Sequence, residues 1–338
     1  MEHKPHFFEV DLAKGIGILL VIIGHCFPDV SSSAGISIPL FRTVHDIIYT
    51  FHMPLMFMLA GFLAYKVIFL HSFTQRWQHI QKRFVRLIVP YLVIGLLYMP
   101  IKLVMSKYAN QPYDLNSFWQ IMFGENPDGG LWYLWALFVI QGILALVLTK
   151  KDLIISLFLS AVFSILIIFL NLSFYRVDDA FYYMFFVLLG IVIGLNYEKY
   201  EGKYNLIITI VLVLVFSIFV FFTLNRSVVG FKFICGILGS VSVLMISRQL
   251  IISFGENCIC KTIEYIGKYS MDIYVLHGIV MVAIRIVFWS TLKVNYYLCT
   301  LTMLMGGLII PIVISKYIIR KSSILTFLLL GEKSQKRQ

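Results

Sequence analysis

Long apolar segments separated by short polar loops dominate this sequence and restrict what it can fold into. About 20 apolar residues in a helix cross the hydrocarbon core of a bilayer. Hydropathy places ten such segments, at about residues 10–27, 46–69, 87–105, 131–149, 153–171, 181–197, 205–224, 230–247, 269–288 and 296–319. The chain is 60% hydrophobic and only 13% charged, with a mean hydropathy of +0.88. We therefore predict an all-α polytopic membrane protein with about ten transmembrane helices.

The distribution of Lys and Arg predicts the sidedness of the loops. An even number of spans puts both termini on one side. If that side is the cytoplasm, only eight of the 28 Lys and Arg residues lie outside: Arg42, Lys102, Lys107, Arg176, Arg226, Lys232, Arg285 and Lys293. Cytoplasmic loops carry an excess of basic residues, so we expect both termini to be cytoplasmic. The net charge of +11 then reflects membrane topology and does not indicate a nucleic-acid partner.

The sequence shows no internal repeat, no low-complexity segment and no soluble domain. We expect one integral membrane domain over residues 1–338, with a helical core at about 10–320 and a cytoplasmic tail at 321–338. Neither a His-Glu-x-x-His zinc motif nor a phosphate-binding P-loop occurs. We therefore predict no metal and no permanently bound cofactor.

The first apolar segment carries an acid, a base and a histidine: Asp11, Lys14 and His25. Ionisable groups inside a membrane usually face a bundle interior or a water-filled cavity. Lys14 and His25 are eleven residues apart, about three helical turns, so they share one helix face. A neutral histidine can take a proton from a hydroxyl group, as acyl transfer to an alcohol requires. A snorkelling lysine and a histidine bonded between helices are the structural alternative.

A basic stretch at residues 71–86, interpreted as a cytoplasmic loop, ends in Arg83 and Arg86. These two arginines are three residues apart and would share a helix face. The guanidinium fork matches phosphate geometry, and coenzyme A carries three phosphate groups. Ordinary positive-inside charge is the alternative explanation for this stretch.

Two further segments carry polar residues at helical spacing. His45 and His52 are seven residues apart, and Gly61 with Pro54 would allow a kink or a close helix contact. Ser270, Tyr274 and His277 follow an i, i+4, i+7 pattern and form one face. A position at the membrane interface is the favoured alternative for His45, whereas His52 lies deeper. Hydrogen bonding between helices is the alternative for Ser270, Tyr274 and His277. Aromatic residues around Trp132 fit a membrane-interface belt or a sugar-stacking surface.

Together these stretches resemble the membrane-bound acyltransferase 3 family, which includes polysaccharide O-acetyltransferases and fucose-4-O-acetylase-like proteins. Lys14 and His25 are similar to the family's basic-x10-His motif, where Arg is the more usual base. The matching stretches continue along the chain through Phe51–Phe62, Arg83–Arg86, Gly130–Leu134 and Ile266–His277. Ala60 and Gly130 stand where the family often has Ser and His. The resemblance covers about residues 8–320.

The resemblance implies an acetyl-CoA donor on the cytoplasmic side, and a glycan or lipid-linked sugar as the acceptor, in the inner membrane of a bacterium. By the same resemblance His25 is the catalytic residue, and Lys14, Arg83 and Arg86 hold the donor. Asp11, His52, Trp132, Ser270, Tyr274 and His277 are expected to bind the acceptor or to support the site. Lys14 cannot reproduce the fork of the more usual Arg.

The sequence leaves three alternatives open. A transporter or flippase for lipid-linked glycans would also need buried charges and a polar stripe. The same fold could transfer another acyl group, such as succinyl. His25 could deprotonate the acceptor hydroxyl directly, or it could carry the acetyl group for a time.

Overall fold

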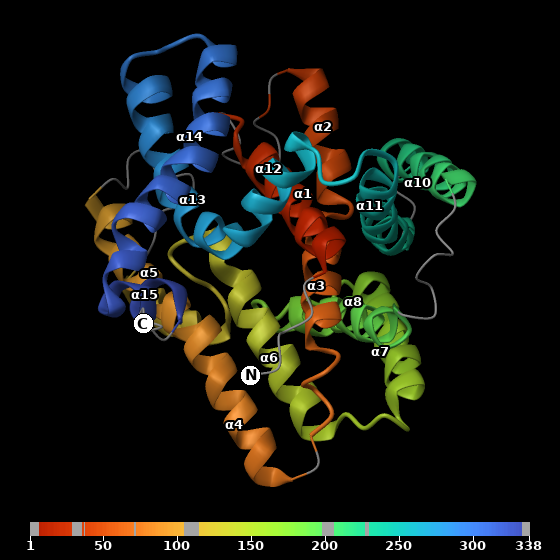
Figure 1. Ribbon diagram of the computed structural model, residues 1–338. Helices are drawn as coiled ribbons and strands as arrows, with labels where there is room; N and C mark the ends of the chain where they lie inside the picture. Colours follow the sequence, from red (N-terminus) through yellow and green to blue (C-terminus); the bar gives the residue numbers. More distant parts are fainter. Residues whose placement is uncertain are drawn as a thin grey trace.

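The computed structural model describes residues 7–28, 36, 38–70, 72–104, 115–197, 206–226 and 230–332. Within these ranges every regular element is a helix and no strand occurs, as Figure 1 shows. The α-helices are α1 (Phe8–His25), α2 (Pro39–Tyr49), α3 (His52–Ala64), α4 (Phe73–Arg83), α5 (Val89–Val104), α6 (Trp132–Val147), α7 (Leu153–Leu170), α8 (Val177–Leu195), α10 (Leu206–Arg226), α11 (Phe231–Phe254), α12 (Cys258–Lys268), α13 (Ser270–Ile284), α14 (Tyr296–Tyr317) and α15 (Ser323–Leu330). The described residues also contain two π-helices, η1 (Phe84–Ile88) and η5 (Arg285–Thr291), and three 3-10 helices, η3 (Leu115–Phe123), η4 (Gly129–Leu131) and η6 (Ile319–Lys321). The predicted all-α class is confirmed.

Nine helical segments in the described part of the chain are long and apolar enough to cross a membrane. They are Pro39–Ala64, Phe73–Pro100, Gly129–Val147, Leu153–Leu170, Val177–Leu195, Leu206–Asn225, Phe231–Phe254, Ser270–Thr291 and Tyr296–Lys321. Helix α1 corresponds to the remaining predicted span, and its 18 residues include Glu9, Asp11 and Lys14. The chain is thus a polytopic membrane protein.

Helix α1 lies in the interior of the bundle, in contact with α2, α3, α11, α12, α13 and α14. This enclosure explains how a helix with three charged residues is accommodated, because its polar groups meet protein and not lipid. The side chain of Glu9 is buried and pairs with Arg248 of α11 at 3.4 Å. Gly15 and Gly267 let the backbones of α1 and α12 approach closely, since a Cβ at either position would collide with the other helix.

Two segments are more structured than the sequence predicted. The stretch interpreted as a basic loop is mostly helix α4, which begins with a reciprocal cap between Ser72 and Gln75 and continues through η1 into α5. Residues 323–330, predicted as part of the tail, form α15, which packs on α5 and η1 and is capped by Ser322. Each helix begins at its own serine N-cap, Ser72 for α4 and Ser322 for α15. A serine N-cap is a signal for the start of a helix, but the basic residues nearby obscured it.

Helix α3 forms the centre of the bundle. Of its 13 residues, all except Ala60 and Leu63 are buried. It packs most extensively on α8, and glycines make this contact possible. A Cβ at Gly61 would collide with the carbonyl of Val187, and one at Gly190 would collide with the carbonyl of Met58. The close helix contact predicted at Gly61 is confirmed.

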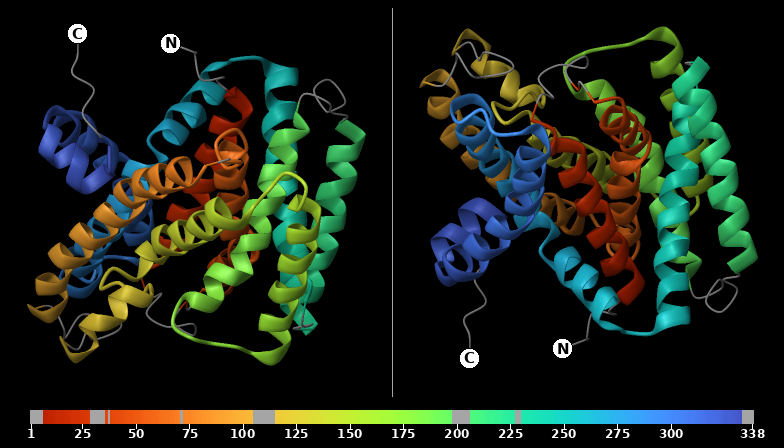
Figure 2. Two further views of the ribbon diagram at one scale, coloured as in Figure 1. Left: turned by 90° about the horizontal axis from the view of Figure 1, so that it is seen from below. Right: turned by 90° about the horizontal axis from the view of Figure 1, so that it is seen from above.

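The periphery is formed by helices that bury little of their surface. Only 17% of the apolar window of α7 and 11% of that of α10 is buried within the protein. Both views in Figure 2 show α10 along one edge of the bundle, whereas α1 lies inside. In the same views the first turn of α1 and helix α15 lie towards one side of the molecule. The exposed apolar side chains of α7 and α10 are therefore suited to contact lipid.

The contact between α3 and α8 predicts different effects for two glycine substitutions. Gly190→Ala should destabilise the protein by about 1–3 kcal/mol because the added methyl group forces the two backbones apart. Gly142→Ala on α6 meets no atom within 4 Å and should be neutral or stabilising by up to about 1 kcal/mol. Thermal unfolding in detergent, followed by circular dichroism, measures both. Equal stability of the two variants would contradict the close packing.

Candidate active site

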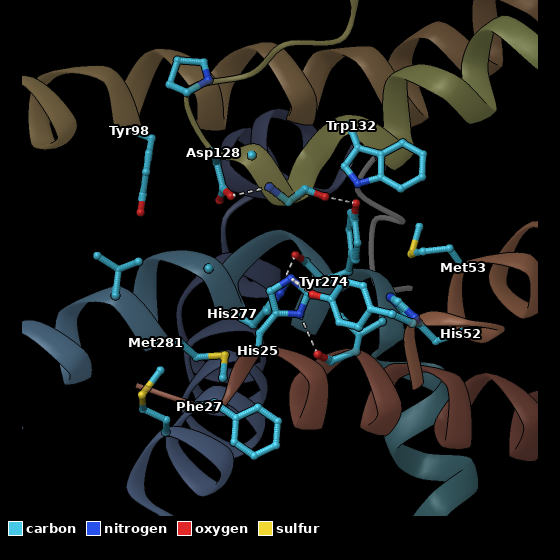
Figure 3. A pocket seen from close by; sticks show the side chains of 18 of the residues that line it. His25, Phe27, His52, Met53, Tyr98, Asp128, Trp132, Tyr274, His277 and Met281 are labelled. Carbon is cyan, nitrogen blue, oxygen red and sulfur yellow. Dashed lines mark hydrogen bonds between the residues drawn. The ribbon is translucent and has the colours of Figure 1, made fainter. Parts of the chain in front are cut away.

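A cavity of about 650 Å³ opens at the C-terminal end of α1. Half of the ten side chains singled out from the sequence line it: His25, His52, Trp132, Tyr274 and His277. Figure 3 shows Asp128 and Trp132 on one side of this cavity, with His25 and His277 on the other. Segments that are remote in the sequence therefore converge on one polar chamber inside the helical bundle.

His25 presents one ring nitrogen to the cavity. Its Nδ1 lies 2.8 Å from the backbone carbonyl of Val21. A carbonyl only accepts hydrogen bonds, so Nδ1 carries the proton and donates it, and Nε2 keeps its lone pair. The hydroxyl group of Tyr49 lies 3.5 Å from Nε2. This is the tautomer that a proton acceptor in hydroxyl chemistry requires.

His52 and His277 are held in the same way. Nδ1 of His52 donates to the carbonyl of Ile48 at 2.9 Å, and Nδ1 of His277 donates to that of Tyr274 at 2.7 Å. Both side chains are buried, each with 3% of its surface exposed, whereas His25 is half-buried. The His277 ring lies edge-on to the His25 ring, with centroids 5.5 Å apart. Among the three, His25 is therefore the most accessible to a substrate.

Asp128 is a cavity residue that the sequence did not single out. It belongs to Asn-Pro-Asp-Gly-Gly, a run of residues typical of turns, and the structure places it across the cavity from His25 and His277. Its Oδ1 accepts a hydrogen bond from the backbone N–H of Gly130 at 3.1 Å, and its own N–H donates to Asn126 at 2.9 Å. Its carboxylate packs against Gly278, where a Cβ would come within 2.7 Å of Oδ2.

The environment of Asp128 favours an electrostatic interaction with His25. Burial raises the pKa of the Asp128 carboxyl, while the Gly130 N–H, the His25 ring and the Lys102 charge act in the opposite direction. A carboxylate here would stabilise the imidazolium that forms when His25 accepts a proton. The only sequence signal for a role of Asp128 at the site was its position close to the Trp132 motif. The preference of aspartate for turns explained that position equally well.

Tyr274 and Trp132 fix the loop that carries Asp128. The Tyr274 hydroxyl donates to the carbonyl of Gly130, two residues after Asp128. The guanidinium carbon of Arg176 lies 5.7 Å from the centre of the Trp132 ring. These contacts join α13 and the segment before α8 to the start of α6, and they hold the cavity wall in place.

The other five predicted side chains lie outside the cavity lining: Asp11, Lys14, Arg83, Arg86 and Ser270. Lys14 Nζ pairs with Asp11 Oδ1 at 2.5 Å in the first half of α1, away from the cavity at His25. The π-helix η1 begins directly after Arg83 and contains Arg86, so the regular α-helical spacing assumed for this pair does not hold. Arg83 lies near Tyr133. The hydroxyl group of Tyr133 donates a hydrogen bond to the backbone carbonyl of Met56 at 3.3 Å.

Arg86 takes part in an ionic network that the sequence did not reveal. Its Nη1 donates to the Leu330 carbonyl at 2.6 Å and to Glu332 Oε1 at 2.7 Å. The second oxygen of Glu332 accepts from Arg320 at 3.0 Å. Arg320 also donates two hydrogen bonds, each of 2.8 Å, to the buried carboxylate of Asp272. The network thus ties the segment after α15 to η1 and α13.

Comparison with known proteins gives the class of this chain. A family model described as an acyltransferase domain, that of the acyltransferase 3 family, matches residues 7–319. The chain therefore belongs to the acyltransferase 3 family and is a membrane-embedded acyltransferase. Searches among curated proteins and among solved structures each found no match.

The raised pKa of Asp128 predicts the acid limb of the pH–rate profile. The carboxyl group takes up a proton at a higher pH than an exposed aspartate does. Acyl transfer that uses the carboxylate charge should be complete above this raised pKa and should fall as the pH drops through it. Asp128→Asn should lower kcat/KM by about tenfold or more, a loss of about 1.4 kcal/mol, and should remove this limb.

Asp46→Asn is the matched control, because Asp46 pairs with His45 and Arg42 and does not line the cavity. It should leave the pH–rate profile as it is in the wild type. An Asp128→Asn enzyme with a wild-type rate and an intact acid limb would show that the carboxylate does not act on the reaction.

Proposed function

We propose that this chain transfers an acetyl group from acetyl-CoA to a hydroxyl group of a cell-surface polysaccharide or of its lipid-linked precursor, in the inner membrane of a bacterium. Membership of an acyltransferase family supports the reaction type. The observation that carries the proposal is the unprotonated Nε2 of His25 at a cavity that also contains the carboxyl group of Asp128. A cavity of about 650 Å³ falls in the range of small-molecule sites, about 300–1,000 Å³.

The reaction would proceed by general-base catalysis. Nε2 of His25 takes the proton of the acceptor hydroxyl while the oxygen attacks the thioester carbonyl carbon. The tetrahedral intermediate then expels the sulfur of coenzyme A, which receives the proton from His25. Asp128 stabilises the imidazolium between these two steps, and the Nδ1 bond to Val21 keeps the ring orientation fixed throughout.

A covalent route uses the same nitrogen. Nε2 would attack the thioester and carry the acetyl group, and the acceptor hydroxyl would then displace His25 in a second step. This route predicts an acetylated protein when the acceptor is absent, whereas general-base catalysis does not. Rapid quenching with radiolabelled acetyl-CoA, followed by mass spectrometry of the α1 peptide, distinguishes them.

The donor is proposed to reach His25 from the side of Arg83 and Arg86. Arg86 already holds a carboxylate, that of Glu332, together with the carbonyl of Leu330. A phosphate oxygen offers a guanidinium group the same acceptor chemistry. A phosphate group of coenzyme A would therefore take the place of Glu332 on Arg86.

His25→Gln should reduce transfer by roughly 10²–10⁴-fold, because it removes the proton acceptor while the protein still inserts. The control is His79→Gln on α4. His79 lies outside the cavity lining, and its Nε2 has no hydrogen-bond partner among the described residues. Acetylation of glycan by membranes, followed by proton NMR, measures the rate. Wild-type acetylation by His25→Gln would remove this residue from the mechanism.

Arg86→Ala and Glu332→Gln separate donor binding from structural support, since both break the same ion pair. If Arg86 binds a phosphate group, Arg86→Ala should raise the KM for acetyl-CoA about tenfold or more, as expected for a lost charge-assisted bond. Glu332→Gln leaves the guanidinium group free and should lower this KM or leave it unchanged. Equal increases in both variants would assign Arg86 to structural support alone.

A further inference from the structure

Four basic side chains line the cavity that contains His25: Lys102, Arg176, Lys232 and Arg285. All four belong to the eight Lys and Arg residues that the predicted topology places on the outer side. Basic residues are disfavoured on that side of a membrane protein. Their concentration around one cavity, which has only two acidic lining residues, therefore points to a ligand.

Two of these four side chains are neutralised or held by the protein itself. Arg176 pairs with Glu125 and with Asp179, each at 3.1 Å. Lys102 donates to the carbonyl of Pro127 at 3.1 Å and interacts with the charge of Asp128. Their positive charge is already balanced, and they act mainly to position the cavity wall.

The positive charges of the other two side chains, Lys232 and Arg285, are not balanced in this way. Neither Lys232 nor Arg285 makes an ion pair or a hydrogen bond with any residue that the structure describes. Arg285 is half-buried directly after α13 and lies near Tyr98. Lys232 is exposed in the first turn of α11 and lies near His52. Removing a guanidinium group from water without a partner is costly. An anion bound in the cavity would offset that cost.

We propose that Lys232 and Arg285 bind an anionic group, a carboxylate or a phosphate, on the acceptor. This inference rests on the proposed function and narrows its substrate class to acidic glycans or sugar phosphates. The two cations share the cavity with His25, whereas Arg83 and Arg86, the residues proposed for the donor, lie outside its lining. The anion thus belongs to the molecule whose hydroxyl group must reach His25.

The test compares three acceptors that share one sugar ring: methyl glucoside, methyl glucuronide and glucose 1-phosphate. Purified full-length protein in liposomes is given radiolabelled acetyl-CoA and each acceptor in turn. We expect kcat/KM for at least one anionic acceptor to exceed that for methyl glucoside by about tenfold to a hundredfold, as expected for a charge-assisted bond. A higher kcat/KM for methyl glucuronide would indicate a site for a carboxylate, and a higher kcat/KM for glucose 1-phosphate would indicate a site for a phosphate group.

The double variant Lys232→Gln with Arg285→Gln should lose this preference, so that its kcat/KM for the anionic acceptor falls to about its own value for methyl glucoside. The matched control is Arg42→Gln with Lys293→Gln, two exposed cations from the same predicted side that do not line the cavity. The control should keep the preference for the anionic acceptor. Thermal unfolding of both double variants reports whether each is folded.

Equal kcat/KM for charged and neutral acceptors in the wild type would overturn this inference and leave the proposed function standing. The inference is also overturned if the double variant Lys232→Gln with Arg285→Gln keeps the preference for the anionic acceptor. It is overturned as well if the main defect of this variant is a higher KM for acetyl-CoA, or a selective loss of activity when succinyl-CoA replaces acetyl-CoA as the donor. Those last two results would assign the cations to the donor. Absence of transfer to all three sugars would count against the proposed function itself.

Discussion

The protein depends on keeping a charged helix away from lipid. Helix α1 carries Glu9, Asp11, Lys14 and His25, and a bilayer tolerates such groups only when protein or water surrounds them. Among the helices that the structure describes, α1 packs on α2, α3, α11, α12, α13 and α14. The close contacts at Gly15, Gly61 and Gly190 bring backbones near enough to exclude lipid from this interior. The apolar helices α7 and α10 then remain for the periphery, where burial is lowest.

The same constraint separates structural charges from chemical ones. Asp272, Arg320 and Glu332 pair with one another in a continuous network, and Glu9 pairs with Arg248. At the cavity the pattern changes, because Nε2 of His25 is unprotonated and faces the cavity. Burying polar groups that lack a full set of partners costs free energy. Their concentration at one cavity supports the proposal that the substrates bind there.

Much of the fold follows from the sequence because hydropathy is a local property. The segment predicted at 153–171 is the span Leu153–Leu170, and that predicted at 296–319 is Tyr296–Lys321. The sequence was wrong where a helix is polar or short. Helix α4 was interpreted as a loop because its many basic and polar residues hid a serine cap. Helix α15 was assigned to the tail because it is apolar but only eight residues long, too short to cross a membrane.

The candidate site was only partly predictable. His25 and His277 are recognisable because histidines within apolar segments are unusual, and the structure brings them together. Asp128 was missed because an aspartate between Pro and Gly fits a turn equally well. Asp272 and Arg320 are 48 residues apart, and no local pattern records such a pair. Lys14, Arg83 and Arg86 lie outside the cavity lining, and their assignment to the donor stays a prediction.

The most direct test of the central claim is an experimental structure with a non-reactive acetyl-CoA analogue bound. The account predicts the carbonyl carbon of the analogue in the His25 cavity, about 3–3.5 Å from Nε2 or from a hydroxyl group held by Nε2. A phosphate group would lie on Arg86 in place of Glu332. An analogue whose carbonyl carbon lies outside this cavity, with His25 still bonded only to Val21 and Tyr49, would contradict the account.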